Sequence, residues 1–487
     1  MLKKKIGMIH GVFDVIHFGH ILYFKEAKKK VQKLIVSVTA DQYVNKGPEK
    51  PIFTLKKRME VLRSIKYIDN VIESNYPTAV ENIKKFKPNL YIKGKDYKRT
   101  ADDLSKNILI EKREVEKYGG KIIFTESALY SSSSVINKNF DYINSDARKF
   151  INSLNKKVFL GNLKNIFLNK SDKKILVIGD PIKDIISFVR ASGKSNKNNV
   201  ISTQFLQEEV TDGGISLVIK FLQIFFKKVD YLYLGDIEGF KYLKKIFNTK
   251  SVNIIHIKSD NSIIEKKRFV DQYSNSKLFQ INKNEVTKPH TKSIRIYTKF
   301  LLKNQNKYKN IISFDYGYVL NNNSILKTIN SLNKKKIITN CQSNSFNFGY
   351  NMPNKYKCGL IISMDESEFR LMAQDKESDI KKLLTLHKKY FEKFKYGIVT
   401  QGKNGCHVIE YGKKIYYSPS VFKQSVDSTG SGDLFLTSFF IGLFNNFSIQ
   451  ETAFLSHVVA GLHANQLANR FTISKYLLKK ITEDMLK

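Results

Sequence analysis

Two histidines three residues apart, His17 and His20, stand between a short apolar run and a helical pattern, in the stretch GVFDVIHFGH. Gly11 opens this stretch and allows a ligand to approach the backbone closely. Helix N-terminal N–H groups suit a phosphate, and two imidazoles can stabilise the charge that develops during nucleotidyl transfer. The alternative is a pair of helix-capping histidines. A zinc site is disfavoured because no third ligand has suitable spacing.

A second candidate site lies near the C-terminal end, in VDSTGSGDLFLTSFFIGLF. Gly430 and Gly432 precede a long apolar helix, and Asp433 falls in its first turn. Backbone N–H groups at such a turn can hold a γ-phosphate, while the aspartate accepts the proton of an attacking hydroxyl. The alternative is a simple helix cap. The segment therefore indicates phosphoryl transfer, a chemistry distinct from that of the histidine pair.

The elements that position the first site alternate between strand and helix patterns. We expect strands at Lys5–His10, Leu34–Thr39, Val71–Ile72, Leu90–Ile92 and Ile122–Phe124. Helical patterns lie between them at Gly19–Lys30, Leu55–Ser64 and Val80–Phe86. Such alternation predicts an α/β domain with a parallel, doubly wound sheet over residues 1–140.

A polar segment with helical periodicity from Ala147 to Phe167 predicts a helical linker over residues 141–172. A second α/β domain follows over residues 173–487. Its apolar strands are expected at Lys174–Ile178, Tyr231–Leu234, Asn253–Ile257, Ile311–Phe314, Lys336–Ile338, Gly359–Ile362 and Gly397–Thr400.

The composition is that of a globular protein, with 487 residues, 42% hydrophobic and 26% charged. A net charge of +39 favours polyanionic small molecules, but lysine is spread evenly, which argues against a nucleic-acid module. The apolar runs at 215–226 and 434–444 are broken or too short to cross a membrane. Three cysteines without a metal spacing predict a cytoplasmic protein.

The N-terminal motifs resemble those of the cytidylyltransferase-like nucleotidyltransferases, whose signature is H-x-G-H. HFGH follows FD at the end of the first strand, and KRMEVLRSIKYIDNV, PNLYIKGKDY and YSSSSVIN are similar to later family segments. The positions that match the family's nucleotide and phosphate site are Gly11, Phe13, Asp14, Lys46, Arg58, Lys93, Ser131, Ser132 and Ser133. The resemblance implies a Rossmann-like fold and places Asp96 toward the substrate.

The resemblance also implies roles for these residues. His17 and His20 would stabilise the transferring phosphoryl group, while Arg58, Ser132 and Ser133 would hold the β- and γ-phosphates. A sugar phosphate would attack in line and release pyrophosphate. No general base is required, because the acceptor phosphate is itself the nucleophile. Mg²⁺ is expected with the triphosphate.

The C-terminal motifs resemble those of the PfkB, or ribokinase-like, carbohydrate kinases. DSTGSGD matches the family's D-[ST]-T-G-A-G-D, ILVIGDPIKD its first strand, KKRFVD a substrate segment, and VTQGKNGC the adenine border. The implied catalytic residue is Asp433. The implied nucleotide residues are Thr400, Gly402, Gly430, Ser431 and Gly432, and the implied substrate residues are Asp184, Gly213, Gly214, Arg268 and Asp427.

Three departures from the PfkB pattern affect the sugar and metal sites. The G-G-A-x-N motif reads GGISL, so its Asn is missing, and the D-Y-x-K-G-V-L loop has Tyr318 where Lys is usual. The N-x-x-E motif that organises Mg²⁺ reads DESE, so the expected metal pair is Asp365 and Glu368. A carboxylate in place of an amide is compatible with a metal site.

Together these resemblances predict a bifunctional sugar-activating enzyme that uses ATP, or CTP, with a sugar phosphate. Bifunctional heptose kinase/adenylyltransferases join the same two domain types in the opposite order, and the IKGKDY segment favours a heptose-like sugar 1-phosphate for surface polysaccharide synthesis. The alternative is a cytidylyltransferase for a polyol phosphate such as glycerol 3-phosphate, with a degenerate, ligand-sensing kinase domain. A basic nucleic-acid-binding protein is the remote alternative. Both families often form dimers, so a homodimer is also considered.

Overall fold

The computed structural model describes residues 5–44, 51–94, 107–125, 145–194, 200–274, 276–283, 288–422, 425–466 and 473–486. The chain divides into two compact units, one of residues 1–143 with 474–487 and one of residues 144–473. These units are defined by packing within each unit. The limits predicted from the sequence, 1–140, 141–172 and 173–487, stay a prediction. No helix within the described ranges is long and apolar enough to span a membrane.

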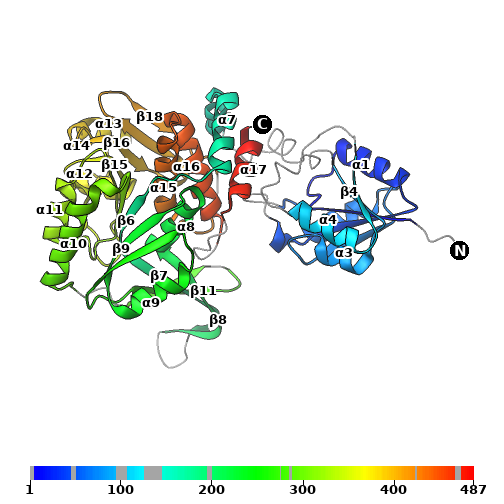
Figure 1. Ribbon diagram of the computed structural model, residues 1–487, viewed down its shortest axis with the longest axis horizontal. Helices are drawn as coiled ribbons and strands as arrows, with labels where there is room; N and C mark the ends of the chain where they lie inside the picture. Colours follow the sequence, from blue (N-terminus) through cyan, green and yellow to red (C-terminus); the bar gives the residue numbers. More distant parts are fainter. Residues whose placement is uncertain are drawn as a thin grey trace. The chain divides into compact units, whose positions relative to one another are not determined.

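The first unit is built on a five-stranded parallel sheet with the order β3-β2-β1-β4-β5 (Figure 1). Its strands are β1 Ile6–Gly11, β2 Lys33–Thr39, β3 Asn70–Ser74, β4 Leu90–Lys93 and β5 Lys121–Phe124. Its helices are α1 Phe18–Lys29, α2 Leu55–Arg63, α3 Val80–Phe86, α4 Asn107–Lys117 and α17 Lys475–Leu486. The predicted α/β class with a parallel sheet is confirmed, and each predicted strand of this region is present.

The strand order of the first sheet fixes where a ligand can bind. The chain winds from β1 to β3 in one direction and then returns to place β4 on the other side of β1. The carboxyl ends of β1 and β4 therefore flank the switch point, where ligands bind in doubly wound sheets. His10 is the residue before the last of β1, and Lys93 is the last residue of β4.

The second unit has a nine-stranded sheet of order β10-β9-β6-β13-β14-β15-β16-β17-β18. These strands are β6 Ile175–Gly179, β9 Val229–Gly235, β10 Val252–Lys258, β13 Asn310–Asp315, β14 Ile337–Cys341, β15 Gly359–Asp365, β16 Phe394–Thr400, β17 Cys406–Glu410 and β18 Ile415–Ser418. The seven predicted strands form the parallel part, from β10 to β16. The antiparallel edge of β17 and β18 was not predicted.

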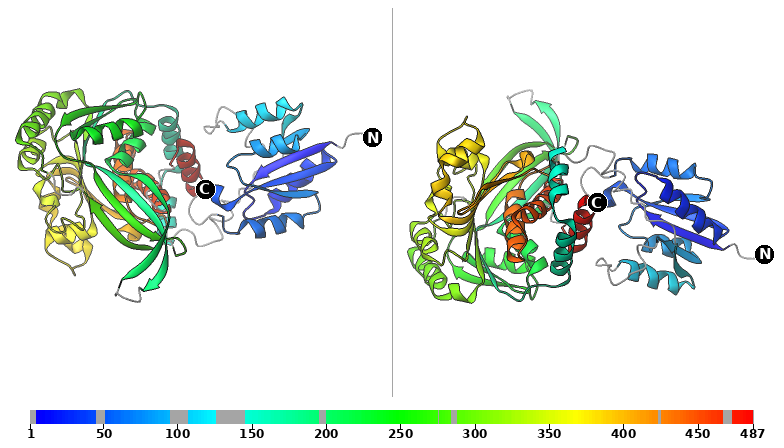
Figure 2. Two further views of the ribbon diagram at one scale, coloured as in Figure 1. Left: turned by 90° about the horizontal axis from the view of Figure 1, so that it is seen from below. Right: turned by 90° about the horizontal axis from the view of Figure 1, so that it is seen from above.

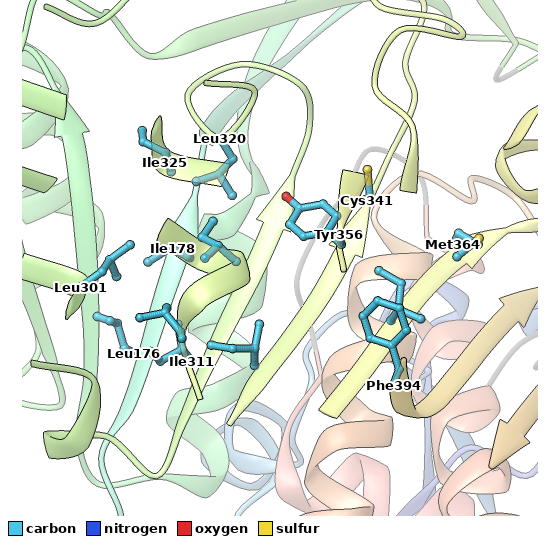
Figure 3. Close-up of a cluster of buried hydrophobic side chains, with 14 of the residues drawn as sticks. Leu176, Ile178, Leu301, Ile311, Leu320, Ile325, Cys341, Tyr356, Met364 and Phe394 are labelled. Carbon is cyan, nitrogen blue, oxygen red and sulfur yellow. The ribbon is translucent and has the colours of Figure 1, made fainter. Parts of the chain in front are cut away.

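Helices cover both faces of the nine-stranded sheet (Figure 2). They are α6 Ser145–Ser153, α7 Lys156–Leu168, α8 Ile215–Phe225, α9 Ile237–Ile246, α10 Thr291–Asn304, α11 Asn323–Ser331, α12 Glu366–Ala373, α13 Ile380–Leu386, α14 Lys388–Phe391, α15 Ser431–Phe444 and α16 Ile449–Ala464. A large core joins one face of the sheet to α10–α14, with Leu176, Ile311 and Leu301 among its buried side chains (Figure 3). The predicted helical segment after residue 144 is divided into α6 and α7, since Asn155 caps the second helix by accepting from the N–H of Val158 at 3.4 Å.

A second, four-stranded sheet was not predicted from the sequence. Its order is β12-β11-β7-β8, from β7 Pro181–Lys194, β8 Ile201–Gly214, β11 Ile264–Asp271 and β12 Lys277–Lys283. The β7–β8 ribbon projects from the body of the second unit (Figure 1). We call these four strands the projecting sheet. Because β8 is largely exposed, its sequence lacks the apolar run by which the other strands were identified.

Arg58 in α2 braces the turn that follows β1. Its side chain is 0% exposed, and its guanidinium donates to the carbonyl oxygens of Val12, Phe53 and Thr39 and to the Asp41 carboxylate, the last at 2.6 Å. A planar guanidinium with several fixed donors suits such a cluster of acceptors. Arg58 therefore holds the chain before the histidine pair against β2 and α2.

We predict that Arg58→Met lowers the free energy of unfolding of the first unit by roughly 3 kcal/mol, because buried carbonyls lose charged donors. Hydrogen exchange of the β1 and β2 amides measures this loss within the unit. Arg63→Met, on the exposed face of the same helix, is the matched control. It should change the free energy of unfolding by under about 0.5 kcal/mol. Unchanged exchange with loss of triphosphate affinity would contradict the bracing role.

Candidate active sites

The histidine pair of the first unit lies at the N-terminus of α1. His17 precedes the helix, its backbone N–H donates to His20 Nδ1 at 3.3 Å, and the two imidazole centroids are 3.9 Å apart. Phe13, held at φ 50°, places its ring 5.6 Å from that of His20. The helix and the turn thus bring both predicted catalytic imidazoles to one place, at the end of a helix that favours anions.

Two polar side chains stand near the switch point of the first sheet. Lys93 Nζ is 2.9 Å from the Glu111 carboxylate, and both side chains are buried. His10 Nδ1 lies 3.0 Å from Ser37 Oγ. Burial, with the charge of Lys93, lowers the pKa of His10 to about 4, so this imidazole is neutral near pH 7. Sequence reasoning missed His10, although its place at a strand end was a signal.

The other predicted residues of this site have different surroundings. Asp14 is buried, and its carboxylate accepts the N–H groups of Ile52 and Phe53 at 2.9 and 3.0 Å. Arg58 is the brace described above, so the structure gives both residues a part in shaping the turn. Gly11 packs against the ring of Phe13, where a Cβ would lie 3.0 Å from the ring. Lys46, Asp96, Ser131, Ser132 and Ser133 lie outside the described residues.

The second unit contains a cavity of about 470 Å³ between the projecting sheet and the carboxyl ends of the nine-stranded sheet. Most predicted residues of this unit line it: Asp184, Gly214, Arg268, Asp365, Glu368, Thr400, Gly402, Gly430, Ser431, Gly432 and Asp433. Gly213 pairs with Ile182 inside the projecting sheet and does not line the cavity. Asp427 also lies outside the lining, at the start of the turn that leads to Asp433.

Asp433 is buried in the first turn of α15, and two side chains hold its carboxylate. Tyr316 Oη donates to Oδ2 at 2.9 Å, and Asn340 Nδ2 donates to Oδ1 at 2.8 Å. Burial raises the pKa of Asp433 to about 6, against the effect of these two donors. Tyr316 follows β13, and Asn340 lies in β14. Sequence reasoning missed both donors because they are distant from Asp433 in the chain.

Gly430 shapes the turn before Asp433. It has φ 76°, in the left-handed region, where a side chain would be strained. The turn then enters α15, and its residues from Gly430 to Asp433 line the cavity. Such a helix start is suited to a phosphate.

The opposite wall of the cavity carries an ion pair. Arg268 Nη1 in β11 is 2.6 Å from Asp184 Oδ1 in β7, and both side chains are nearly buried. Lys266, two residues before Arg268, lines the same wall. These polar groups can fix hydroxyl or anionic groups of a substrate.

Asp365 and Glu368 start α12 as a reciprocal cap. Asp365 Oδ1 accepts the N–H of Glu368 at 2.8 Å, and Glu368 Oε2 accepts the N–H of Asp365 at 2.8 Å. Burial, with the charge of Asp365, raises the pKa of Glu368 to about 8. Two adjacent carboxylates at a phosphate cavity fit a Mg²⁺ that keeps several waters. Within the described ranges no group of three or more His, Cys, Asp or Glu side chains forms a metal site.

Two regions of the chain match two different protein families. The cytidylyltransferase-like family matches residues 8–139, and the pfkB family of carbohydrate kinases matches residues 321–473. Bifunctional protein HldE of Blochmanniella floridana is 36% identical over 138 residues, 27% of each chain. HldE of Coxiella burnetii (strain Dugway 5J108-111) is 37% identical over 122 residues, 25% of this chain and 24% of the relative. The match spans about a quarter of these relatives' length.

Solved structures resemble the chain in fold. Phosphofructokinase-2 from Escherichia coli in complex with potassium superposes with a TM-score of 0.51 at 12% identity, covering 64% of this chain and 98% of that one. A point mutant of the same protein gives 0.50 at 13% identity, with the same coverage. The chain therefore joins a cytidylyltransferase-like domain to a C-terminal carbohydrate kinase domain of the pfkB family.

Proposed function

We propose that this chain is a bifunctional sugar-activating enzyme. The second unit phosphorylates a sugar or sugar phosphate from ATP, and the first transfers a nucleotidyl group from ATP or CTP to a heptose-like sugar 1-phosphate. The observation that carries the proposal is the buried Asp433 carboxylate beside a glycine turn, facing a cavity whose other wall holds Asp184 and Arg268. The name of the relatives, bifunctional protein HldE, supports two activities in one chain. Nucleotide-sugar and surface polysaccharide synthesis would use the products.

In the kinase reaction a substrate hydroxyl attacks the γ-phosphorus of ATP. The new O–P bond forms as the bond from the γ-phosphorus to its bridging oxygen breaks, and ADP leaves. Asp433 accepts the hydroxyl proton, while Tyr316 and Asn340 keep its carboxylate in place. The N–H groups of the turn from Gly430 stabilise the transferred group. Asp365 and Glu368 would hold a Mg²⁺, which when bound would supply positive charge against that of the triphosphate.

In the nucleotidyl transfer a phosphate oxygen of the sugar phosphate attacks the α-phosphorus, and pyrophosphate leaves. His17 and His20 stabilise the charge on the transferring group. Lys93, at the carboxyl end of β4 near the switch point, remains a predicted phosphate contact, and a phosphate would have to share its ammonium group with Glu111. Lys46 and Ser131–Ser133 remain predicted contacts of the triphosphate, and Asp96 a predicted contact of the substrate.

A cytidylyltransferase for a polyol phosphate such as glycerol 3-phosphate, joined to a ligand-sensing kinase domain, is the second candidate. The altered GGISL motif favours it, because the sugar-binding Asn is absent.

The three cysteines that the structure describes are all unpaired, which supports a cytoplasmic location for either candidate.

Separate substitutions should separate the two activities. His17→Ala is expected to lower pyrophosphate release at least about 100-fold and leave ADP formation with a sugar unchanged, since it removes a stabilising imidazole. Asp433→Asn should lower ADP formation with a sugar to a similar extent and leave pyrophosphate release unchanged, since it removes the proton acceptor. Four nucleoside triphosphates tested against sugar 1-phosphates and polyol phosphates identify the first reaction. Absence of pyrophosphate release for every pair, from folded wild-type protein, contradicts the transferase assignment.

The same experiment decides between the two candidates. ADP formation that depends on a sugar and is lost in Asp433→Asn supports the kinase. Pyrophosphate release only with CTP and a polyol phosphate, together with no sugar-dependent ADP formation by the wild-type protein, supports the second candidate.

The pH dependence of the kinase tests the role of Asp433. The carboxylate must be ionised to accept a proton, so kcat should rise with pH through about 6. Tyr316→Phe removes a hydrogen bond to the charged form, which should move this rise upward by about one pH unit. A kcat profile that is unchanged in Tyr316→Phe would show that another group controls the rise.

A further inference from the structure

Lys277 connects the projecting sheet to the turn that carries Asp433. It is the first residue of β12, and its Nζ lies 2.7 Å from Asp427 Oδ1 and 3.1 Å from Thr429 Oγ1. The Asp427 side chain is 4% exposed and that of Lys277 is 40% exposed. A nearly buried carboxylate thus receives an ammonium group from a strand 150 residues earlier in the chain.

Asp427 organises the first half of the turn. Its Oδ1 accepts the N–H of Thr429 at 3.0 Å and the hydroxyl of Thr429 at 2.7 Å. The N–H groups of Val426 and Asp427 both donate to the carbonyl of Ala464, at 2.7 and 2.8 Å. The residues from Ser428 to Asp433 line the cavity. Asp427 therefore holds the start of the turn whose residues line the cavity.

The other end of this connection is the wall that faces the substrate. β12 pairs with β11, and β11 carries Arg268, the partner of Asp184. Lys277 thereby joins the strands of the substrate wall to the glycine turn. Although burial acts to raise it, the pKa of Asp427 is lowered by the donors Lys277 and Thr429, so the carboxylate is ionised and attracts the ammonium.

We propose that Lys277 is a positioning residue for phosphoryl transfer, which holds the turn from Asp427 to Asp433 in the conformation that binds the γ-phosphate. This inference rests on the proposed kinase function. Lys277 does not line the cavity, so it acts through Asp427 and Thr429. A brace that served stability alone would leave the affinities for ADP and for ATP equally affected.

The test compares Lys277→Ala with the wild-type full chain by calorimetry, using ADP and the β,γ-imido analogue of ATP. We expect the affinity for the analogue to fall about ten- to hundredfold, as loss of a charged hydrogen bond produces, and that for ADP to fall less than about threefold. Methylammonium should restore at least about fivefold of the lost analogue affinity in the variant and leave the wild type unchanged. Equal loss for both nucleotides, or no recovery with methylammonium, overturns the proposal.

Lys267→Ala is the matched control, because Lys267 pairs with Glu208 at 2.6 Å in the same sheet and does not line the cavity. It should bind both nucleotides as the wild type does. Lys277→Arg keeps the charge and should retain analogue affinity within about threefold. A loss of about tenfold or more in Lys277→Arg overturns the proposal, including where Lys277→Ala fails to fold. Wild-type protein that binds the analogue in this Lys277-dependent way but phosphorylates no sugar would contradict the kinase function and leave the positioning role intact.

Discussion

The second site depends on keeping one carboxylate both buried and able to ionise. Asp433 lies in the first turn of α15 and is 4% exposed, and most residues that follow it are buried and apolar, so little water stabilises its charge. Tyr316 and Asn340 donate to its two oxygens in place of water. These donors come from the region of β13 and β14, so the register of the central sheet decides whether Asp433 has them. The pKa near 6 is the balance between burial and these donors.

The same constraint explains why both sites lie at carboxyl ends of parallel strands. Parallel strands are apolar along their length because helices cover both faces, so polar side chains collect where the strands end. In the first unit His10 lies one residue before the end of β1, and Lys93 is the last residue of β4. In the second unit β13 and β15 lead to Tyr316 and Asp365. The chemistry differs, but the place is set by the same winding of the chain.

Sequence patterns predicted the parts of the molecule whose signal is local. Apolar runs identified the parallel strands of both sheets, and the glycine turn with Asp433 identified the start of α15. Tyr316, Asn340 and Lys277 were missed because their partners lie 93 to 150 residues away in the chain. In the projecting sheet, β8 was missed because this largely exposed strand has no apolar run.

Residue type alone was also insufficient in the first unit. Arg58 and Asp14 match the positions of a phosphate site, and a sequence does not reveal that their charges are directed to backbone groups nearby. Both residues still bear on the site, because they hold the turn before the histidine pair. A direct contact of either residue with a phosphate stays a prediction.

Asp365 stands where the N-x-x-E motif has Asn, and this difference changes the charge at the start of α12 more than the shape of the helix cap. Asp and Asn are equally good helix caps, and Asp365 fills that role by accepting the N–H of Glu368. The start of α12 therefore has the same shape with either residue, and Glu368 keeps its bonds to the N–H groups of Asp365 and Ser343. What the aspartate adds is one negative charge beside a buried carboxyl, which contributes to the raised pKa of Glu368. Two adjacent carboxylates repel each other, and a divalent cation relieves that repulsion. The replacement thus favours a cation at this end of the cavity, where the phosphates of ATP would need one.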